Sequence, residues 1–166
     1  MRTALAIVTL LFALPSPAFA EGPQPNYTTL IIEFVGEMDK PVFPIVISTS
    51  SGEAEWYRQN LYQGSTRIFT NVDVVSASTL KEIAELPLLK RALENARPTD
   101  DREPKSTPTV RFIAGVGHDH TQIMLEAQTS AKVLVGIESL VAQYPALQSQ
   151  IQEVESRIKS ATVRHR

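Results

Sequence analysis

Two stretches near the start of the chain carry large apolar side chains at every second position. Large apolar side chains occupy every second position of residues 30–35, and a similar alternation returns over 42–47 after a short polar stretch. A period of two residues is typical of a β-strand, so the two stretches predict an antiparallel hairpin. Pro41 and Pro44 carry no backbone N–H, which predicts an edge strand or a bulge for the second stretch. A further strand is predicted over 68–75.

A second hairpin is predicted in the second half of the chain. Residues 110–116 and 123–127 alternate in the same way, and the polar tip Gly117-His118-Asp119-His120 separates them. Glycine and aspartate are common at such tips because they adopt turn conformations readily. Each half of the chain therefore opens with a predicted hairpin that a helical region follows.

Three short helices are predicted between the hairpins, over 53–62, 79–86 and 87–93. Thr79 is followed three residues later by Glu82, which is the spacing of a capping box at a helix start. Pro87 would either stop or kink the helix that begins at Thr79, or open the third helix, where its missing N–H costs nothing.

The most regular apolar pattern lies in the last third of the chain. Apolar residues recur there at alternating intervals of four and three, at Val133, Ile137, Leu140, Tyr144, Leu147, Ile151, Val154 and Ile158. This spacing predicts a long amphipathic C-terminal helix. Beyond Pro145 the neighbouring positions become polar, which leaves a narrow apolar ridge formed by Leu147, Ile151, Val154 and Ile158.

This ridge predicts one partner helix. The partner helix would come from the same chain, where the helices between Leu80 and Leu93 are the candidates, or from a second copy, or from another protein. The ridge residues are therefore the predicted partner-binding residues. Pro145 keeps the apolar positions in phase, so one kinked helix and two abutting helices both fit the pattern.

Together these elements predict a single α+β domain over residues 29–166. It would hold an antiparallel sheet of about five strands, made of two hairpins and one further strand, with helices packed on one face. Residues 21–28 are expected to form a disordered lead. Residues 97–108 contain no large apolar side chain and predict a polar linker.

The first twenty residues have the order of a secretory signal. Arg2 precedes an apolar run over 4–14, and Ala18-Phe19-Ala20 forms a small-residue cleavage site. The run is shorter than the roughly 18 residues that a spanning helix needs, so cleavage after Ala20 is expected to leave no stable membrane anchor. The mature protein is therefore predicted to be periplasmic or secreted.

Composition narrows the chemistry. The 16 Lys and Arg residues against 18 Asp and Glu residues give a net charge of −2, which is no footprint for nucleic acid. The chain has no cysteine, so disulfides and thiol nucleophiles are excluded.

No catalytic residues are predicted, and no cofactor. The serine run 48–51 lacks the glycine-flanked turn of a serine nucleophile. Glu53 with Glu55, and Asp100 with Asp101, are acidic pairs close in sequence, but sequence proximity favours solvated surface residues over paired acid and base groups.

One cluster has the character of a metal site. His118, Asp119 and His120 place two imidazoles two positions apart, and alternate residues of a strand point to the same side. A stable zinc site would need a third or fourth ligand, for which His165 and unassigned carboxylates are the candidates. The alternative is an exposed polar turn.

Three hypotheses for the function follow. The first is an exported, non-catalytic binding or interaction protein that uses the ridge to bind a protein partner or a second copy. The second is a small metal-binding protein, or a metal-dependent enzyme, centred on His118 to His120. The third is a periplasmic inhibitor or immunity protein. Trp56, Tyr57 and Tyr62 add an aromatic concentration that would suit either a ligand groove or the core.

Overall fold

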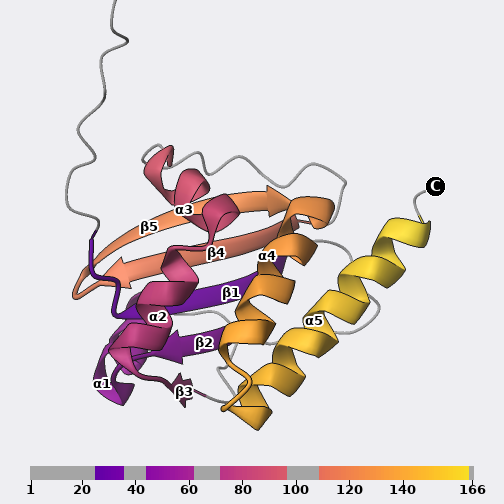
Figure 1. Cartoon of the computed structure of the whole chain (residues 1–166). Helices are drawn as coiled ribbons and strands as arrows, with labels where there is room; N and C mark the ends of the chain where they lie inside the picture. Colours follow the sequence, from indigo (N-terminus) through magenta and orange to yellow (C-terminus); the bar gives the residue numbers. More distant parts are fainter. Residues whose placement is uncertain (1–24, 36–43, 62–71, 97–108, 165–166) are drawn as a thin grey trace, which may run out of the picture.

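The computed structural model describes residues 25–35, 44–61, 72–96 and 109–164 (Figure 1). Its strands form one five-stranded sheet in the order β3-β2-β1-β4-β5. The strands are β1 (Thr29–Val35), β2 (Ile45–Ser48), β3 (Val72–Val74), β4 (Thr109–Val116) and β5 (Asp119–Glu126). The helices are α1 (Ser51–Leu61), α2 (Ala77–Ala84), α3 (Pro87–Glu94), α4 (Ala127–Leu140) and α5 (Pro145–Arg164). The predicted single-domain α+β fold is confirmed.

The sheet is mixed, because β3 runs parallel to β2. All other neighbouring strands are antiparallel. Helix α1 lies between β2 and β3 in the sequence, and such a crossover returns the chain to the same end of the sheet. The prediction of an entirely antiparallel sheet is corrected at this one pair.

The central strand β1 is buried on both of its faces. Leu30, Ile32 and Phe34 join the larger apolar core, whereas Ile31 belongs to a second, smaller cluster. The second cluster includes Ala54 and Tyr57 of α1, so α1 covers the face opposite the other helices. The expectation of helices on one face is therefore corrected by α1.

Glu33 lies on the α1 side of β1 and is only 1% exposed. The sheet register places it opposite Arg111 of β4, and the Arg111 Nη1 atom lies 3.2 Å from Glu33 Oε2. A buried carboxylate needs such a cation, because an unpaired charge in the interior is strongly unfavourable.

The other face of the sheet carries helices α2 to α5. Helices α4 and α5 lie side by side across it (Figure 1), and both contribute buried residues to the larger core. The chain turns between them over 141–144, and Pro145 is the first residue of α5. Two abutting helices are thus observed, with proline at the position where its missing N–H is harmless.

Helix α2 begins earlier than its sequence predicts. Ser76 is its N-cap, since the Ser76 hydroxyl accepts the N–H of Thr79 at 3.1 Å. Thr79 is therefore inside the first turn, where its hydroxyl contacts Ser76 Oγ at 2.8 Å. The cap assigned to Thr79 is corrected to Ser76.

The predicted signal at 1–20 and the linker at 97–108 lie outside the described residues. Residues 25–28, the end of the expected lead, are described, and the Thr28 N–H donates to the Gly115 carbonyl at 2.8 Å. Among the described residues, no helix is both long and apolar enough to cross a membrane.

Candidate functional site

The four residues of the ridge lie inside the protein. Their side chains are at most 4% exposed, and all belong to the larger core: Leu147, Ile151, Val154 and Ile158. Of the three sources of a partner helix that the sequence leaves open, the structure has one from the same chain, because α4 covers the ridge. This helix differs from the same-chain candidates between Leu80 and Leu93, since α5 packs mainly on α4 and also contacts β2. Binding of a protein partner stays a prediction that needs another surface.

The tip of the second hairpin is shorter than predicted. Gly117 and His118 alone form the turn, while Asp119 and His120 belong to β5. Gly117 has a φ of +59°, a conformation that tight two-residue hairpin turns require and that glycine adopts without steric cost. The tip is therefore a tight turn, and His118 and His120 differ in their backbone setting.

Both histidines lie against aromatic residues of α1. The His118 ring is 4.5 Å from the Trp56 ring, and the His120 ring is 6.2 Å from the Tyr57 ring, with the planes nearly perpendicular. Trp56 is half-buried, and both histidines are exposed. Contact between α1 and the hairpin thus brings together two sequence regions about sixty residues apart.

These contacts bear on the predicted metal site at His118, Asp119 and His120. Within the described residues, no group of three or more His, Asp and Glu side chains is arranged to hold a metal ion. His165, the proposed additional ligand, lies outside the described residues. The metal hypothesis stays a prediction, which zinc content after dialysis would test.

Tyr57 joins α1 to the hairpin. Its side chain is fully buried, and its hydroxyl donates to the Asp119 carbonyl at 2.9 Å. A Cβ atom built on Gly115 would lie 1.8 Å from the Tyr57 hydroxyl oxygen and 2.3 Å from Cζ. The tyrosine ring therefore occupies space that exists only because residue 115 has no side chain.

Alkaline pH is expected to destabilise the protein through Tyr57. Burial raises the pKa of its hydroxyl to about 12, and the charges of Glu53 and Asp119 add to the effect. The unfolded tyrosine ionises near 10, so stability from this group is complete below pH 10 and is lost as the pH rises towards 12. Urea unfolding between pH 9 and 12 should show a smaller pH-dependent loss in Tyr57→Phe than in the natural protein. Equal losses would contradict the prediction.

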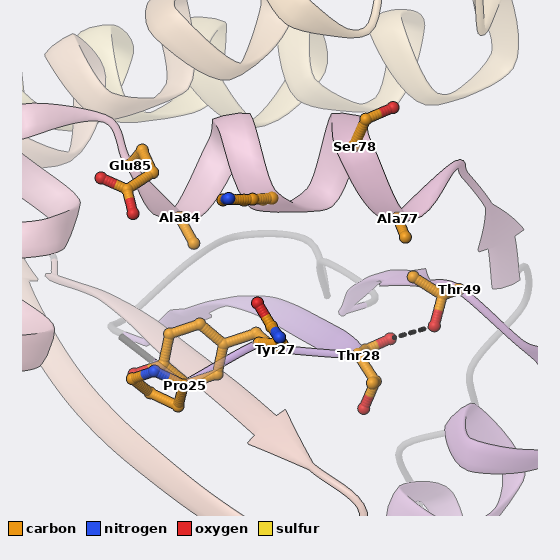
Figure 2. Close-up of a pocket in the computed structure, with 10 residues that line it drawn as sticks. Pro25, Tyr27, Thr28, Thr49, Ala77, Ser78, Ala84 and Glu85 are labelled. Carbon is orange, nitrogen blue, oxygen red and sulfur yellow. Dashed lines mark hydrogen bonds between the residues drawn. The ribbon is translucent and has the colours of Figure 1, made fainter. Parts of the chain in front are cut away.

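A cavity lies between α2 and the segment that leads into β1 (Figure 2). It has a volume of about 480 Å³. Its walls come from the segment before β1, the end of β2 and one side of α2, namely Pro25, Asn26, Tyr27, Thr28, Thr49, Ala77, Ser78, Lys81, Ala84 and Glu85. Figure 2 shows Ala77 and Ala84 directed from α2 towards Thr49 and Tyr27.

The cavity offers both hydrogen-bond donors and acceptors. The Thr28 hydroxyl donates to the Gly115 carbonyl at 3.2 Å, and the Thr49 hydroxyl donates to the Thr28 carbonyl at 3.3 Å. Because their hydrogens are engaged, both oxygens are left as acceptors. Lys81 supplies an ammonium donor, while the Glu85 carboxylate lies 3.1 Å from Lys90 Nζ.

The lining also holds one aromatic ring. Tyr27 is half-buried, and burial, with a smaller effect of Glu94, raises the pKa of its hydroxyl. At neutral pH this group is therefore an uncharged donor and acceptor. Small alanines on one wall and a ring on the other leave room for a flat or compact polar molecule.

The remaining candidates from the sequence do not form a site. Glu55 is on the exposed side of α1, where hydrogen bonds from Arg58 and Gln59 lower its pKa to about 2. Ser48 is buried and bonded to Thr29 at 2.9 Å, which is a structural role within the sheet. Asp100, Asp101 and Tyr62 lie outside the described residues.

Sequence reasoning did not identify the cavity. Its residues come from three separated stretches, and none of them belongs to a recognisable motif. Asn26, Ser78 and Lys81 are ordinary surface residue types, so no local pattern marks them.

Comparison with known proteins finds no matching family, no similar curated protein and no similar solved structure.

Proposed function

We propose that this protein is exported and acts by binding a small polar molecule in the cavity beside α2, without catalysing a reaction. One observation carries the proposal: the cavity measures about 480 Å³. Ligand sites in proteins typically measure roughly 300 to 1,000 Å³ and carry a few convergent polar groups.

The chemistry of the lining indicates the class of ligand. Threonine oxygens accept hydrogen bonds, whereas Lys81 and Asn26 donate them, and Tyr27 supplies a ring face. A molecule with both hydroxyl and carboxylate groups would satisfy these residues, and a purely apolar one would leave them unpaired. The titratable residues among the described lining are Tyr27, Lys81 and Glu85. These three side chains can form hydrogen bonds or ion pairs with a ligand.

Export is supported by the signal-like order of residues 1–20. The chain has no cysteine, and a small binding protein outside the cytoplasm needs neither a disulfide nor a thiol nucleophile. The proposal therefore keeps the non-catalytic binding role expected from the sequence and places it at the cavity.

The binding site is tested by adding ligands and by a substitution that fills the cavity with a side chain. Amide shifts of residues 21–166 would be recorded by NMR while neutral sugars, amino acids and small hydroxy acids are added. Saturable shifts are expected at Thr28, Thr49 and Ser78 for at least one of these classes. Ala77→Phe, in the first turn of α2, should weaken that binding by about tenfold or more, because the new ring occupies the cavity.

Ala146→Phe is the matched control, since Ala146 is likewise an exposed alanine in the first turn of a helix. It should leave the shifts unchanged. Binding that survives Ala77→Phe, or shifts spread away from the cavity, would show that this cavity is not the site.

A further inference from the structure

The charge on the walls of the cavity beside α2 narrows the class of its ligand. Ala77, Lys81 and Ala84 follow one another at intervals of four and three residues, so they share one face of the helix. Figure 2 shows Ala77 and Ala84 directed from α2 into the cavity, and Lys81 belongs to the same wall. Lys81 therefore lies between two methyl groups on this wall, and its side chain is exposed.

Glu85, an acidic residue of the lining, does not neutralise Lys81. It lies four residues after Lys81 on α2, a spacing at which lysine and glutamate can pair. The Glu85 carboxylate instead lies 3.1 Å from the Lys90 Nζ atom. In the part of the chain that the structure describes, no carboxylate forms an ion pair with Lys81. The α2 wall of the cavity therefore presents a positive charge.

The other side of the cavity offers a different chemistry. Thr28 and Thr49 lie there, and Figure 2 shows the hydrogen bond between them. Both hydroxyl hydrogens are donated to backbone carbonyls, so both hydroxyl oxygens can accept hydrogen bonds from a ligand. An ionised carboxylate has no hydrogen to donate to these oxygens, whereas a ligand hydroxyl has one. The two walls thus suit the two ends of a molecule that carries both groups.

We propose that the cavity selects a small hydroxy acid, whose carboxylate binds the Lys81 ammonium and whose hydroxyl donates to Thr28 or Thr49. Lys81 is then the residue that distinguishes this anion from a neutral molecule of the same shape. Tyr27 does not repel the anion, because burial raises the pKa of its hydroxyl and the group stays uncharged at neutral pH. The selection by Lys81 rests on the proposed function, since it needs a ligand in the cavity.

The same NMR titration tests this selection when it compares lactate, mandelate and 4-hydroxybenzoate with their primary amides. Each amide keeps the size and the hydroxyl of its acid but carries no charge. For at least one acid, we expect a dissociation constant about fivefold below that of its amide, as an exposed ion pair provides. Salt at about 0.5 M should reduce the difference, because it screens exposed charges.

Variants of Lys81 assign the preference to this side chain. Lys81→Gln should weaken binding of the acid about fivefold, to the level of the amide, and should leave the amide unaffected. Lys81→Arg keeps the charge and should retain the preference. Lys132→Gln is the matched control, since Lys132 is an exposed lysine of α4 outside the cavity lining, and it should change neither affinity. Circular dichroism would verify that each variant is folded.

The possible failures are distinguishable. An acid and an amide that bind equally well in the cavity would overturn the selection by Lys81. So would an acid whose affinity survives Lys81→Gln or falls equally in Lys132→Gln, or a neutral sugar that binds there when no acid does. Each of these results leaves the cavity as a binding site. If no compound shifts the cavity residues, or if the shifts are insensitive to Ala77→Phe, the proposed function itself fails and the selection fails with it.

Discussion

Replacement of Gly115 by alanine is expected to lower the free energy of unfolding by about 3 kcal/mol, the upper part of the range for overpacked cores. The new Cβ would lie 1.8 Å from the Tyr57 hydroxyl oxygen, a separation that no pair of unbonded atoms tolerates. The Tyr57 ring cannot move aside, because it is fully buried where α1 packs on the sheet. Urea unfolding monitored by Trp56 fluorescence would measure the loss.

A double-mutant cycle shows whether the collision is the cause. Tyr57→Ala is itself destabilising, but adding Gly115→Ala to it should cost far less than in the natural protein, with a coupling energy of about 2 kcal/mol. Gly52→Ala is the matched control, because a Cβ there meets no atom within 4 Å. Additive effects of Gly115→Ala and Tyr57→Ala would contradict the described contact.

Ile151→Asp is expected to lower the free energy of unfolding by more than about 4 kcal/mol, the size that marks a buried unpaired charge. Ile151 is 0% exposed, because it lies on the face of α5 that packs into the core. The described core residues around Ile151 are apolar, so a buried aspartate would be unpaired among them, and the lost isoleucine leaves a cavity as well. Thermal unfolding followed by circular dichroism should show a transition that is shifted far down or absent.

Ser149→Asp on the same helix separates the effect of burial from that of charge. Ser149 is exposed, so the change should alter stability by no more than roughly 0.5 kcal/mol. If Ile151→Asp were as stable as Ser149→Asp, α5 would not be packed on α4 as described. The ridge residues would then lie on the surface of the protein.

The sequence pattern predicted where the helices and strands lie better than it predicted which residues pack against them. The alternation of residues 30–35 correctly predicts β1, but it does not tell that the face with Ile31 and Glu33 is buried as well. Both are buried, because α1 covers Ile31 and because Arg111, 78 residues away, pairs with Glu33. A partner so distant in sequence leaves no trace in a local pattern.

The ridge illustrates the same limit. A stripe of apolar residues on a helix indicates that another element covers it, but the stripe does not identify that element. Here a turn over 141–144 folds α5 back along α4, so the cover comes from the same chain. Tyr57 likewise gives no sign in the sequence that it needs a glycine at position 115.

Strand β1 pairs along its whole length with β4, and the paired residues lie 74 to 86 positions apart, from Val35 with Thr109 to Thr29 with Gly115. Strands β1 and β4 therefore cannot pair along their whole length until the chain as far as the end of β4 is present. Contacts over such a separation slow folding, because a large loop must close before they form. A chain that is made from its N-terminus first would hold Leu30, Ile32 and Phe34 uncovered during that interval. Keeping these apolar side chains from contact with other chains until β4 is available is thus a requirement that this topology sets.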